Sequence, residues 1–375
     1  QTLLQVSAPR HLRGRVMSVW LLNRGTVPFG ALLAGYLAQV YGGQDALRIM
    51  SVRMEEEIAR LSTAIFAESK HPFNINSPQQ LGKILFEDLG LPAPVKAGKG
   101  KGISTAAGVL EDLAEEYPIV QKVLDYRQVA KLKGTYVEAL PQLIDPFDRR
   151  VHTTLHQTGA ATGRLSSSNP NLQNIPIRTE LGREIRSAFV PEPGWSLIVA
   201  DYSQIELRLL AHYSRDAVLC DAFRHNEDIH TRTASEVFGV PPLMVDAEQR
   251  RNAKAVNFGI VYGQTAFGLS QQLGIDRREA DQYIRAYFER YSGVRRWIDQ
   301  TIAEVRRTGY AVNLFGRRRP IPDIASRNPN ARGFAERTAV NTPLQGTAAD
   351  LIKLAMIRIA AKLAGKKSRM LLQVH

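Results

Sequence analysis

A short apolar run that ends at an aspartate constrains this chain more than any other feature. Trp195–Val199 is apolar and follows Pro193-Gly194, which predicts a buried strand. Ile205–Tyr213 then mixes apolar and charged residues, as the start of a helix does. Asp201 therefore falls where a rigid strand would end, a position that holds a carboxylate still. Alternatively, Asp201 simply caps the following helix, because aspartate is a favoured N-cap residue.

The charge balance points to an anionic partner. The chain of 375 residues has 49 Lys and Arg against 36 Asp and Glu, a formal net charge of +13. Nucleic acid or an anionic membrane is the partner that such a chain fits best. The length permits roughly two or three domains. Cys220 is the single cysteine, which excludes an intramolecular disulfide and fits a reducing compartment.

Residues 1–50 do not read like the rest of the chain. Between Val16 and Tyr41 the only charged residue is Arg24, and a helix of about 20 apolar residues is long enough to span a membrane. Arg24 and Pro28 inside this run argue against a span. The segment resembles one loop and helix of a major facilitator transporter. That resemblance predicts a transporter fragment joined to another protein, with possible membrane contact by residues 16–41. The alternative is an ordinary apolar helix packed on the next domain.

Residues 52–144 are expected to be mostly helical. Amphipathic patterns predict helices at Met54–Glu68, Gln79–Leu89, Ala106–Glu116 and Ile119–Leu132. A basic, glycine-rich loop at Ala97–Gly102 interrupts them. This arrangement fits any small helical domain, and its basic loop also suits contacts with the phosphates of a nucleic-acid duplex.

One predicted helix carries a stripe of cations followed by aromatic rings. Arg250, Lys254, Phe258 and Tyr262 recur at steps of four, which places them along one helical face. The cations suit the phosphates of a nucleoside triphosphate, and the rings suit its sugar and base. The alternative is a common amphipathic helix with a solvated basic end and a buried aromatic end.

Three further segments contain candidate binding residues or predicted secondary structure. Residues 156–176 are rich in turn-forming residues and hold amide and Arg side chains that fit sugar and base edges. A long helix is predicted at Arg337–Leu363, with Asn341 and Gln345 on one face. Residues 370–375 have the pattern of a strand.

Several motifs in a fixed order resemble the polymerase portion of bacterial DNA polymerase I, the family A DNA polymerases. The likeness runs from about Val52 to His375, most of the chain. The motifs are Thr162–Ser167, Asn171–Pro176, Asp201–Arg208, Arg250–Gly263 and Gln373–His375.

The resemblance implies an α+β fold shaped as a right hand, with a helical thumb, an antiparallel-sheet palm and helical fingers. An extra apolar helix would precede the hand. The expected domains are residues 1–50 (apolar helix), 51–150 (thumb and connection), 151–207 (first part of the palm), 208–337 (fingers) and 338–375 (second part of the palm). The family's third motif continues past its histidine with an Asp-Glu pair, whereas this sequence stops at His375. The palm is therefore expected to be incomplete.

The resemblance also implies roles for individual residues. Asp201 would bind two Mg²⁺ ions together with the carbonyl of Tyr202, and Glu206 would occupy the space of a ribose 2′-OH. The residues expected to bind the nucleotide are Glu206, His230, Arg250, Lys254, Phe258 and Tyr262. The residues expected to contact DNA are Arg164, Asn174, Arg178, Arg337, Asn341, Gln345, Gln373 and His375.

The function implied is template-directed DNA polymerisation, in which a dNTP is added to a primer 3′-OH by two-metal chemistry. The expected partners are primer-template DNA and dNTPs, for a monomeric bacterial enzyme of replication or repair in the cytoplasm, at the nucleoid. Without the second carboxylate, the chain as given is expected to have little or no activity. The alternatives are a non-catalytic DNA-binding remnant, a single-subunit RNA polymerase, against which Glu206 argues, and a membrane transporter fragment.

Overall fold

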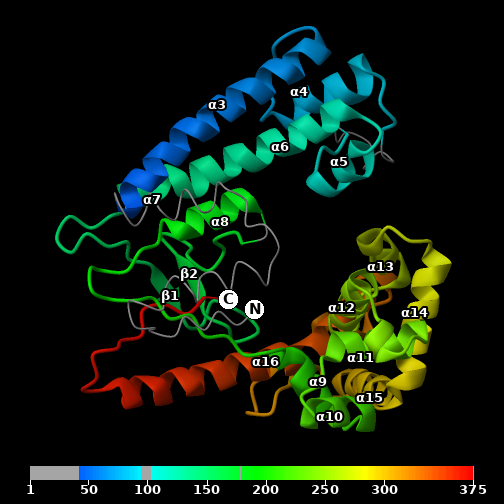
Figure 1. Cartoon of the computed structure of the whole chain (residues 1–375). Helices are drawn as coiled ribbons and strands as arrows, with labels where there is room; N and C mark the ends of the chain where they lie inside the picture. Colours follow the sequence, from blue (N-terminus) through cyan, green and yellow to red (C-terminus); the bar gives the residue numbers. More distant parts are fainter. Residues whose placement is uncertain (1–41, 94–102, 178, 375) are drawn as a thin grey trace. The chain divides into compact units, whose positions relative to one another are not determined.

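A computed structural model describes residues 42–93, 103–177 and 179–374 (Figure 1). The chain divides into two compact units. The described part of one, here called the α3 unit, comprises residues 42–154, 167–199 and 374. The described part of the other, here called the α16 unit, comprises residues 155–166 and 200–373.

The α3 unit is built on two long helices that run side by side (Figure 1). These are α3 (Gly43–Ser69) and α6 (Pro118–Leu132), and the latter begins with a proline, which is preorganised for the first helical turn. Its other helices are α4 (Pro78–Gly82), the π-helix η2 (Lys83–Asp88), α5 (Ala107–Ala114), the π-helix η3 (Lys133–Val137), α7 (Ala139–Gln142) and α8 (Glu180–Ser187). Apolar side chains of α3, η2, α5 and α6 form one core, including Ile65, Leu85, Leu110 and Val123.

An ion pair ties α3 to α8. Arg53 Nη1 lies 3.2 Å from Glu184 Oε2, and the Glu184 side chain is only 2% exposed. Burial raises the pKa of Glu184, and the positive charge of Arg53 opposes this rise. The carboxylate therefore carries a desolvation cost that its partner only partly offsets.

The α16 unit is also mainly helical. Its elements are α9 (Ile205–Ser214), α10 (Ala217–Arg224), α11 (Ile229–Phe238), η4 (Pro242–Met244), α12 (Ala247–Val261), α13 (Ala266–Leu273), α14 (Arg277–Arg290), α15 (Ser292–Thr308), β3 (Tyr310–Val312), β4 (Arg318–Pro320), η5 (Pro322–Ala325) and α16 (Pro329–Leu363). Strands β3 and β4 are antiparallel, with Ala311 opposite Arg319.

The core of the α16 unit joins α9, α12, α14, α15 and α16. Leu207, Leu210, Tyr287 and Leu344 are among its fully buried side chains. A polar bond crosses it where the hydroxyl of Tyr213 lies 2.8 Å from Thr347 Oγ1. This bond fixes α9 against α16 at the turn that follows Pro343, the proline inside α16.

Asp216 links two helix N-termini. Its Oδ1 accepts hydrogen bonds from the backbone N–H groups of Val218 and Leu219, both 3.1 Å away, at the start of α10. Its Oδ2 accepts from the N–H of Gly293 at 2.9 Å, in the first turn of α15. Asp216 is 4% exposed. One buried carboxylate thus satisfies donors that the start of a helix leaves unpaired.

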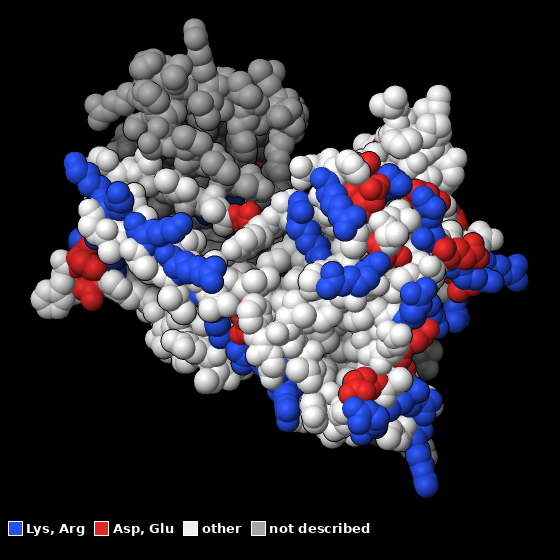
Figure 2. Space-filling view, turned by 90° about the horizontal axis from the view of Figure 1, so that it is seen from below, with Lys and Arg blue, Asp and Glu red and all other residues white. Residues whose placement is uncertain are grey.

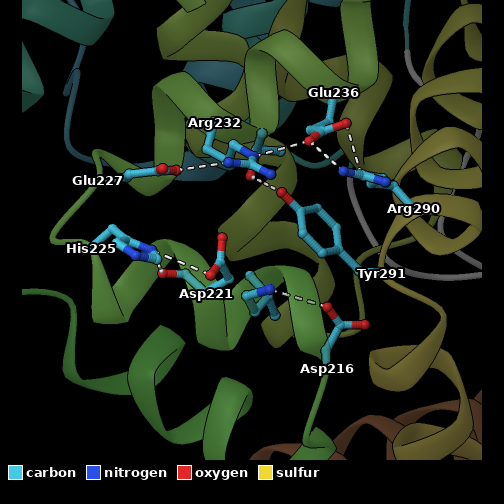
Figure 3. A network of polar contacts seen from close by, with 10 residues as sticks. Asp216, Asp221, His225, Glu227, Arg232, Glu236, Arg290 and Tyr291 are labelled. Carbon is cyan, nitrogen blue, oxygen red and sulfur yellow. Dashed lines mark hydrogen bonds and ion pairs between the residues drawn. The ribbon is translucent and has the colours of Figure 1, made fainter.

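Surface ion pairs fasten α11 to α14 near the same place. Glu236 accepts from both Arg232 and Arg290, and Arg232 also pairs with Glu227 (Figure 3). Because exposed pairs contribute little singly, their importance here is that they form a network.

Within the described residues the predicted helices are confirmed, whereas the predicted strand at Trp195–Val199 is wrong. That run has no regular secondary structure, and Ile198 and Val199 are 61% and 51% exposed. The described residues contain two sheets, β1 (Thr154–His156) with β2 (Ser166–Ser168) and β3 with β4. Neither sheet offers the run a partner, and a strand without one leaves its backbone groups unpaired. Residues 370–374, also predicted as a strand, are equally irregular.

Three predicted domain boundaries fall inside helices. Helix α3 continues unbroken across residues 50 and 51, α9 across residues 207 and 208, and α16 across residues 337 and 338. The apolar run at residues 16–41 lies outside the described residues. Within the described ranges, none of the helices has the length and apolar character needed to cross a bilayer.

Candidate functional site

Glu206 is the centre of a polar cluster in the α16 unit. Its Oε1 accepts from Arg164 Nη2 at 2.8 Å, and its Oε2 accepts from the Tyr262 hydroxyl at 2.8 Å. Glu206 is 9% exposed, so the carboxylate is held by two donors away from most of the solvent. Three segments distant in sequence meet here: the loop before β2, the first turn of α9 and the end of α12.

Tyr262 remains a neutral donor in this cluster. Burial raises the pKa of Tyr262 to about 12, and the negative charge of Glu206 adds to the rise, which Arg164 opposes. At neutral pH the phenol keeps its proton and can only donate to the carboxylate.

The aromatic rings of α12 continue the cluster along one face. The rings of Phe258 and Tyr262 are stacked, with centroids 6.4 Å apart and an angle of 14°. His230 on α11 lies beside Phe258, with centroids 5.9 Å apart. Tyr262 is 41% exposed, so its ring offers a surface against which a planar group could stack.

The cations of the stripe differ in their surroundings. Arg250 donates two hydrogen bonds to Asp228 Oδ2, at 3.0 and 2.6 Å. Burial would raise the pKa of Asp228, but the bonds from Arg250 and from backbone N–H groups outweigh it, and the pKa is lowered. Lys254 is exposed, one turn further along α12. An anion at this face would meet Lys254 directly, and Arg250 only in competition with Asp228.

His230 is the most buried member of the predicted nucleotide-binding set, ahead of Glu206. It is 4% exposed. Burial lowers the pKa of His230 to about 4, and the charges of Arg250 and Lys254 act in the same direction, against Asp228. The imidazole is therefore neutral at physiological pH.

The loop that carries Arg164 packs against the side chain of Arg317. Gly163 has φ +80°, and a Cβ built on it would lie 2.6 Å from Arg317 Nε. Arg317 is held in turn by Asp350, at 3.1 Å from Nε and 2.6 Å from Nη2. Only glycine fits both the backbone angle and this close approach.

An open pocket of about 480 Å³ lies at the end of α12, lined by Tyr262, Gly263, Gln264, Thr265, Gln272 and Arg337. The side chain of Arg337 packs on Gly263, which has φ +65°. This places Arg337 next to the aromatic end of the stripe.

Asp201 and Tyr202 are exposed, in the turn before α9. Gln204, and not Asp201, occupies the N-cap position of α9, and its side chain makes no capping hydrogen bond, so the capping alternative is wrong. Mg²⁺ keeps several waters and takes one or two carboxylates plus substrate phosphates, and a carboxylate that faces solvent suits such a site. In the described ranges, the cluster with three potential ligand groups is a different one, formed by Asp145, Asp148 and His152 in the α3 unit.

The residues predicted to contact DNA have varied surroundings. Asn341 and Gln345 lie on α16, and Asn341 Oδ1 is buried without a hydrogen-bond partner among the described residues. Gln373 lies near the end of the α16 unit, whereas Asn174 belongs to the α3 unit, where its carbonyl accepts from Tyr136 at 2.6 Å. Arg178 and His375 fall outside the described residues.

Sequence reasoning missed the side chains that support the site. Asp228 bonds to Arg250, and Asn257 bonds to His230. Arg317, held by Asp350, lies against Gly163, the residue before Arg164. Asn257 was detectable in principle, as a polar residue among the apolar positions of α12. The others come from elements whose proximity only the tertiary structure reveals.

Basic side chains are prominent on the face of the molecule drawn in Figure 2. Lys and Arg cover more of it than Asp and Glu, and the two signs are interspersed. This agrees with the formal net charge of +13.

Comparisons with known proteins agree with the motifs. The family model for DNA polymerase family A matches residues 44–375. The chain is 51% identical over 365 residues to a thermostable DNA polymerase I of Thermus aquaticus, covering 97% of this chain and 44% of that protein. It is 53% identical over 334 residues to DNA polymerase I of Bacillus subtilis, covering 88% of this chain and 38% of that protein.

A solved structure is similar over almost the whole chain. The POL domain of Pol1 from M. smegmatis, in complex with DNA primer-template and dNTP, superposes with a TM-score of 0.82 at 41% identity. The match covers 96% of this chain and 64% of that one. The chain spans less than half the length of the Thermus aquaticus and Bacillus subtilis polymerases. The match to the Thermus aquaticus protein covers 97% of this chain and therefore includes most of residues 1–50.

Proposed function

This chain belongs to DNA polymerase family A, and on that premise we propose that it performs template-directed DNA synthesis. In this reaction the 3′-oxygen of a primer attacks the α-phosphorus of a dNTP, and pyrophosphate leaves. The observation that carries the proposal is the position of Glu206, held between Arg164 and Tyr262 at the aromatic end of the cationic stripe.

Glu206 is the proposed basis of selection for deoxynucleotides. Its two oxygens are fixed by donors 2.8 Å away, so the carboxylate cannot easily swing aside. A sugar stacked near Tyr262 would place a 2′-hydroxyl against this group. A ribonucleotide would have to displace one of the two hydrogen bonds, which opposes its binding.

The stripe on α12 is proposed to hold the rest of the nucleotide. Lys254 and Arg250 would contact the phosphates, and the rings of Phe258 and Tyr262 would lie against sugar and base. Positive charge at the phosphates stabilises the negative charge that grows on the leaving pyrophosphate.

Asp201 and the carbonyl of Tyr202 are proposed to hold the catalytic Mg²⁺ ions. When bound, the metal would supply Lewis-acid stabilisation of the phosphoryl oxygens. The contribution of this chain is a carboxylate placed five residues ahead of Glu206, in the turn that leads into α9. Metal site and sugar selection are thereby linked through the start of α9.

Primer-template DNA and dNTPs are the proposed partners of a monomeric enzyme located at the bacterial nucleoid. Arg337, Asn341 and Gln345 are proposed to contact template or primer. The basic surface implies DNA binding that weakens steeply with salt, because displaced counterions dominate such binding.

The test compares the binding of dATP and ATP by the intact chain with Mg²⁺ and a primer-template. Wild type should favour dATP, and Glu206→Ala should narrow the preference by about tenfold, the value of one charged hydrogen bond. Glu248→Ala is the matched control, because Glu248 lies exposed on α12 in a surface pair with Arg251. Equal affinity of wild type for dATP and ATP would refute the proposal.

A non-catalytic DNA-binding remnant is the second candidate, favoured by the charge alone. Primer extension separates it from a polymerase. Salt-dependent binding of primer-template without nucleotide selection or extension would favour the remnant.

A further inference from the structure

A buried hydrogen-bonded chain connects three elements behind His230. The Tyr291 hydroxyl, just before α15, lies 3.2 Å from Thr233 Oγ1 on α11. Thr233 Oγ1 lies 3.1 Å from Asn257 Oδ1 on α12. Asn257 Nδ2 lies 3.1 Å from His230 Nδ1. Thr233, Asn257 and Tyr291 are completely buried. The nucleotide site as proposed above uses none of these three residues.

The direction of this chain follows from counting protons. A tyrosine hydroxyl and a threonine hydroxyl each have one proton to donate. If Tyr291 donates to Thr233, then Thr233 donates to the Asn257 carbonyl and the Asn257 amide donates to His230 Nδ1. In the reverse direction the proton of Tyr291 would need another acceptor. Among the described residues Tyr291 makes no other side-chain hydrogen bond. Only the first direction therefore satisfies every link.

The direction determines which ring nitrogen of His230 carries the proton. A nitrogen that accepts from the Asn257 amide has no proton of its own, so the neutral ring must carry its proton on Nε2. His230 Nε2 makes no hydrogen bond with the described residues and keeps contact with solvent. A donor is thus left available beside Phe258 and the cations of α12.

We propose that Asn257, oriented by Thr233 and Tyr291, is a positioning residue that locks His230 as the neutral Nε2–H tautomer and so presents a hydrogen-bond donor to the phosphates of the nucleotide. The identity of that ligand rests on the proposed function, whereas the tautomer does not. An acceptor nitrogen in the same place would repel an anion, so the tautomer decides whether His230 helps or hinders binding.

The charged groups around the ring support a neutral histidine. Asp228, on the loop before α11, favours the charged form, whereas Arg250 and Lys254 on α12 oppose it. Together with burial they lower the pKa of His230 to about 4. The ring is therefore neutral throughout the range in which nucleotides bind, and its tautomer is the property left to be fixed.

The first experiment is NMR of the intact chain with ¹⁵N-labelled histidine, at about neutral pH. A His230→Gln spectrum assigns the signal among the 8 histidines of the chain. We expect an unprotonated Nδ1 and a protonated Nε2 without any nucleotide present. A protonated Nδ1 would overturn the proposal, whether or not dNTP binds.

The second experiment is Asn257→Asp, which reverses the polarity of the last link. The new carboxylate accepts from Nδ1–H and raises the pKa of the histidine, so above that pKa the neutral ring turns an unprotonated Nε2 toward the ligand. We expect the affinity for dATP with Mg²⁺ to fall by about tenfold between about pH 6 and about pH 9 in this variant, and the wild-type affinity to stay flat. Asn252→Asp, which adds the same charge to α12, is the control and should also stay flat.

The outcomes separate the tautomer from the proposed function. An expected wild-type spectrum with no dATP binding would leave the tautomer standing and refute the nucleotide site. A flat profile in a folded Asn257→Asp variant that binds dATP would refute the positioning role. If the variant does not fold, the wild-type spectrum alone decides.

Discussion

Replacing Asp216 with alanine should be among the most destabilising single changes in the α16 unit. The carboxylate serves three backbone donors, two at the start of α10 and one in α15. Loss of an N-cap costs about 0.5–2 kcal/mol. A buried N–H left without a partner, here that of Gly293, costs about 1–3 kcal/mol. Together these give a loss of about 1.5–5 kcal/mol in the free energy of unfolding, or very roughly 3–20 °C in Tm at about 2–4 °C per kcal/mol.

The assay is urea unfolding followed by the fluorescence of Trp297, which lies in the core of the α16 unit. The chain has 3 tryptophans, so Trp20 and Trp195 are first replaced by phenylalanine to isolate this unit. Asp221→Ala is the matched control, because Asp221 lies on the same helix in an exposed pair with His225. It should change the free energy of unfolding by less than about 0.5 kcal/mol.

The reasoning would be refuted if Asp216→Ala and Asp221→Ala unfolded at the same urea concentration with the same slope. Gly293→Ala provides an independent check from the other side of the bond. A Cβ there would lie 2.9 Å from both Asp216 Cα and Asp216 Oδ2, so this variant should also be destabilised.

Three other changes address the site and the α3 unit. Gly163→Ala should lower the free energy of unfolding of the α16 unit by about 1–3 kcal/mol, because its φ of +80° disfavours a side chain; unfolding indistinguishable from wild type would count against the close approach of Arg317. Asp228→Asn keeps the cap of α11 but frees Arg250, so titration with dATP should show an affinity about fivefold higher, and a weaker affinity would contradict the competition. Because burial raises the pKa of Glu184, the folded state binds its proton more tightly than the unfolded chain does. The free energy of unfolding of Glu184→Gln, relative to that of wild type, should therefore be highest at neutral pH and should fall as the pH drops through the raised pKa of Glu184. Urea titrations at several pH values should show this trend, and the opposite trend would refute it.

The local parts of the site could be predicted from the sequence. Arg250, Lys254, Phe258 and Tyr262 follow from helical periodicity, and α12 presents them as expected. The start of α9 near Ile205 was also predicted correctly. In each case neighbours in sequence determine the arrangement.

The predictions that were wrong or missing depend on contacts between segments that are distant in sequence. The apolar run at Trp195–Val199 has the composition of a strand, but a strand also needs a partner, which no local pattern reveals. Likewise, nothing near Arg164 in the sequence identifies Arg317 or Asp350 as its support. Contacts between distant segments were predictable only where the family resemblance supplied them.

The way the backbone alternates between the two units has a consequence for biosynthesis. The chain passes between the units at residues 154–155, 166–167, 199–200 and 373–374, so neither unit is a single stretch of sequence. A ribosome releases the loop bearing Arg164 before Glu206 and long before Arg317, the groups that hold it. During translation this loop therefore lacks its native contacts until Arg317 has been synthesised. Nascent chains arrested between residues 200 and 317 should be cleaved by proteases at this loop.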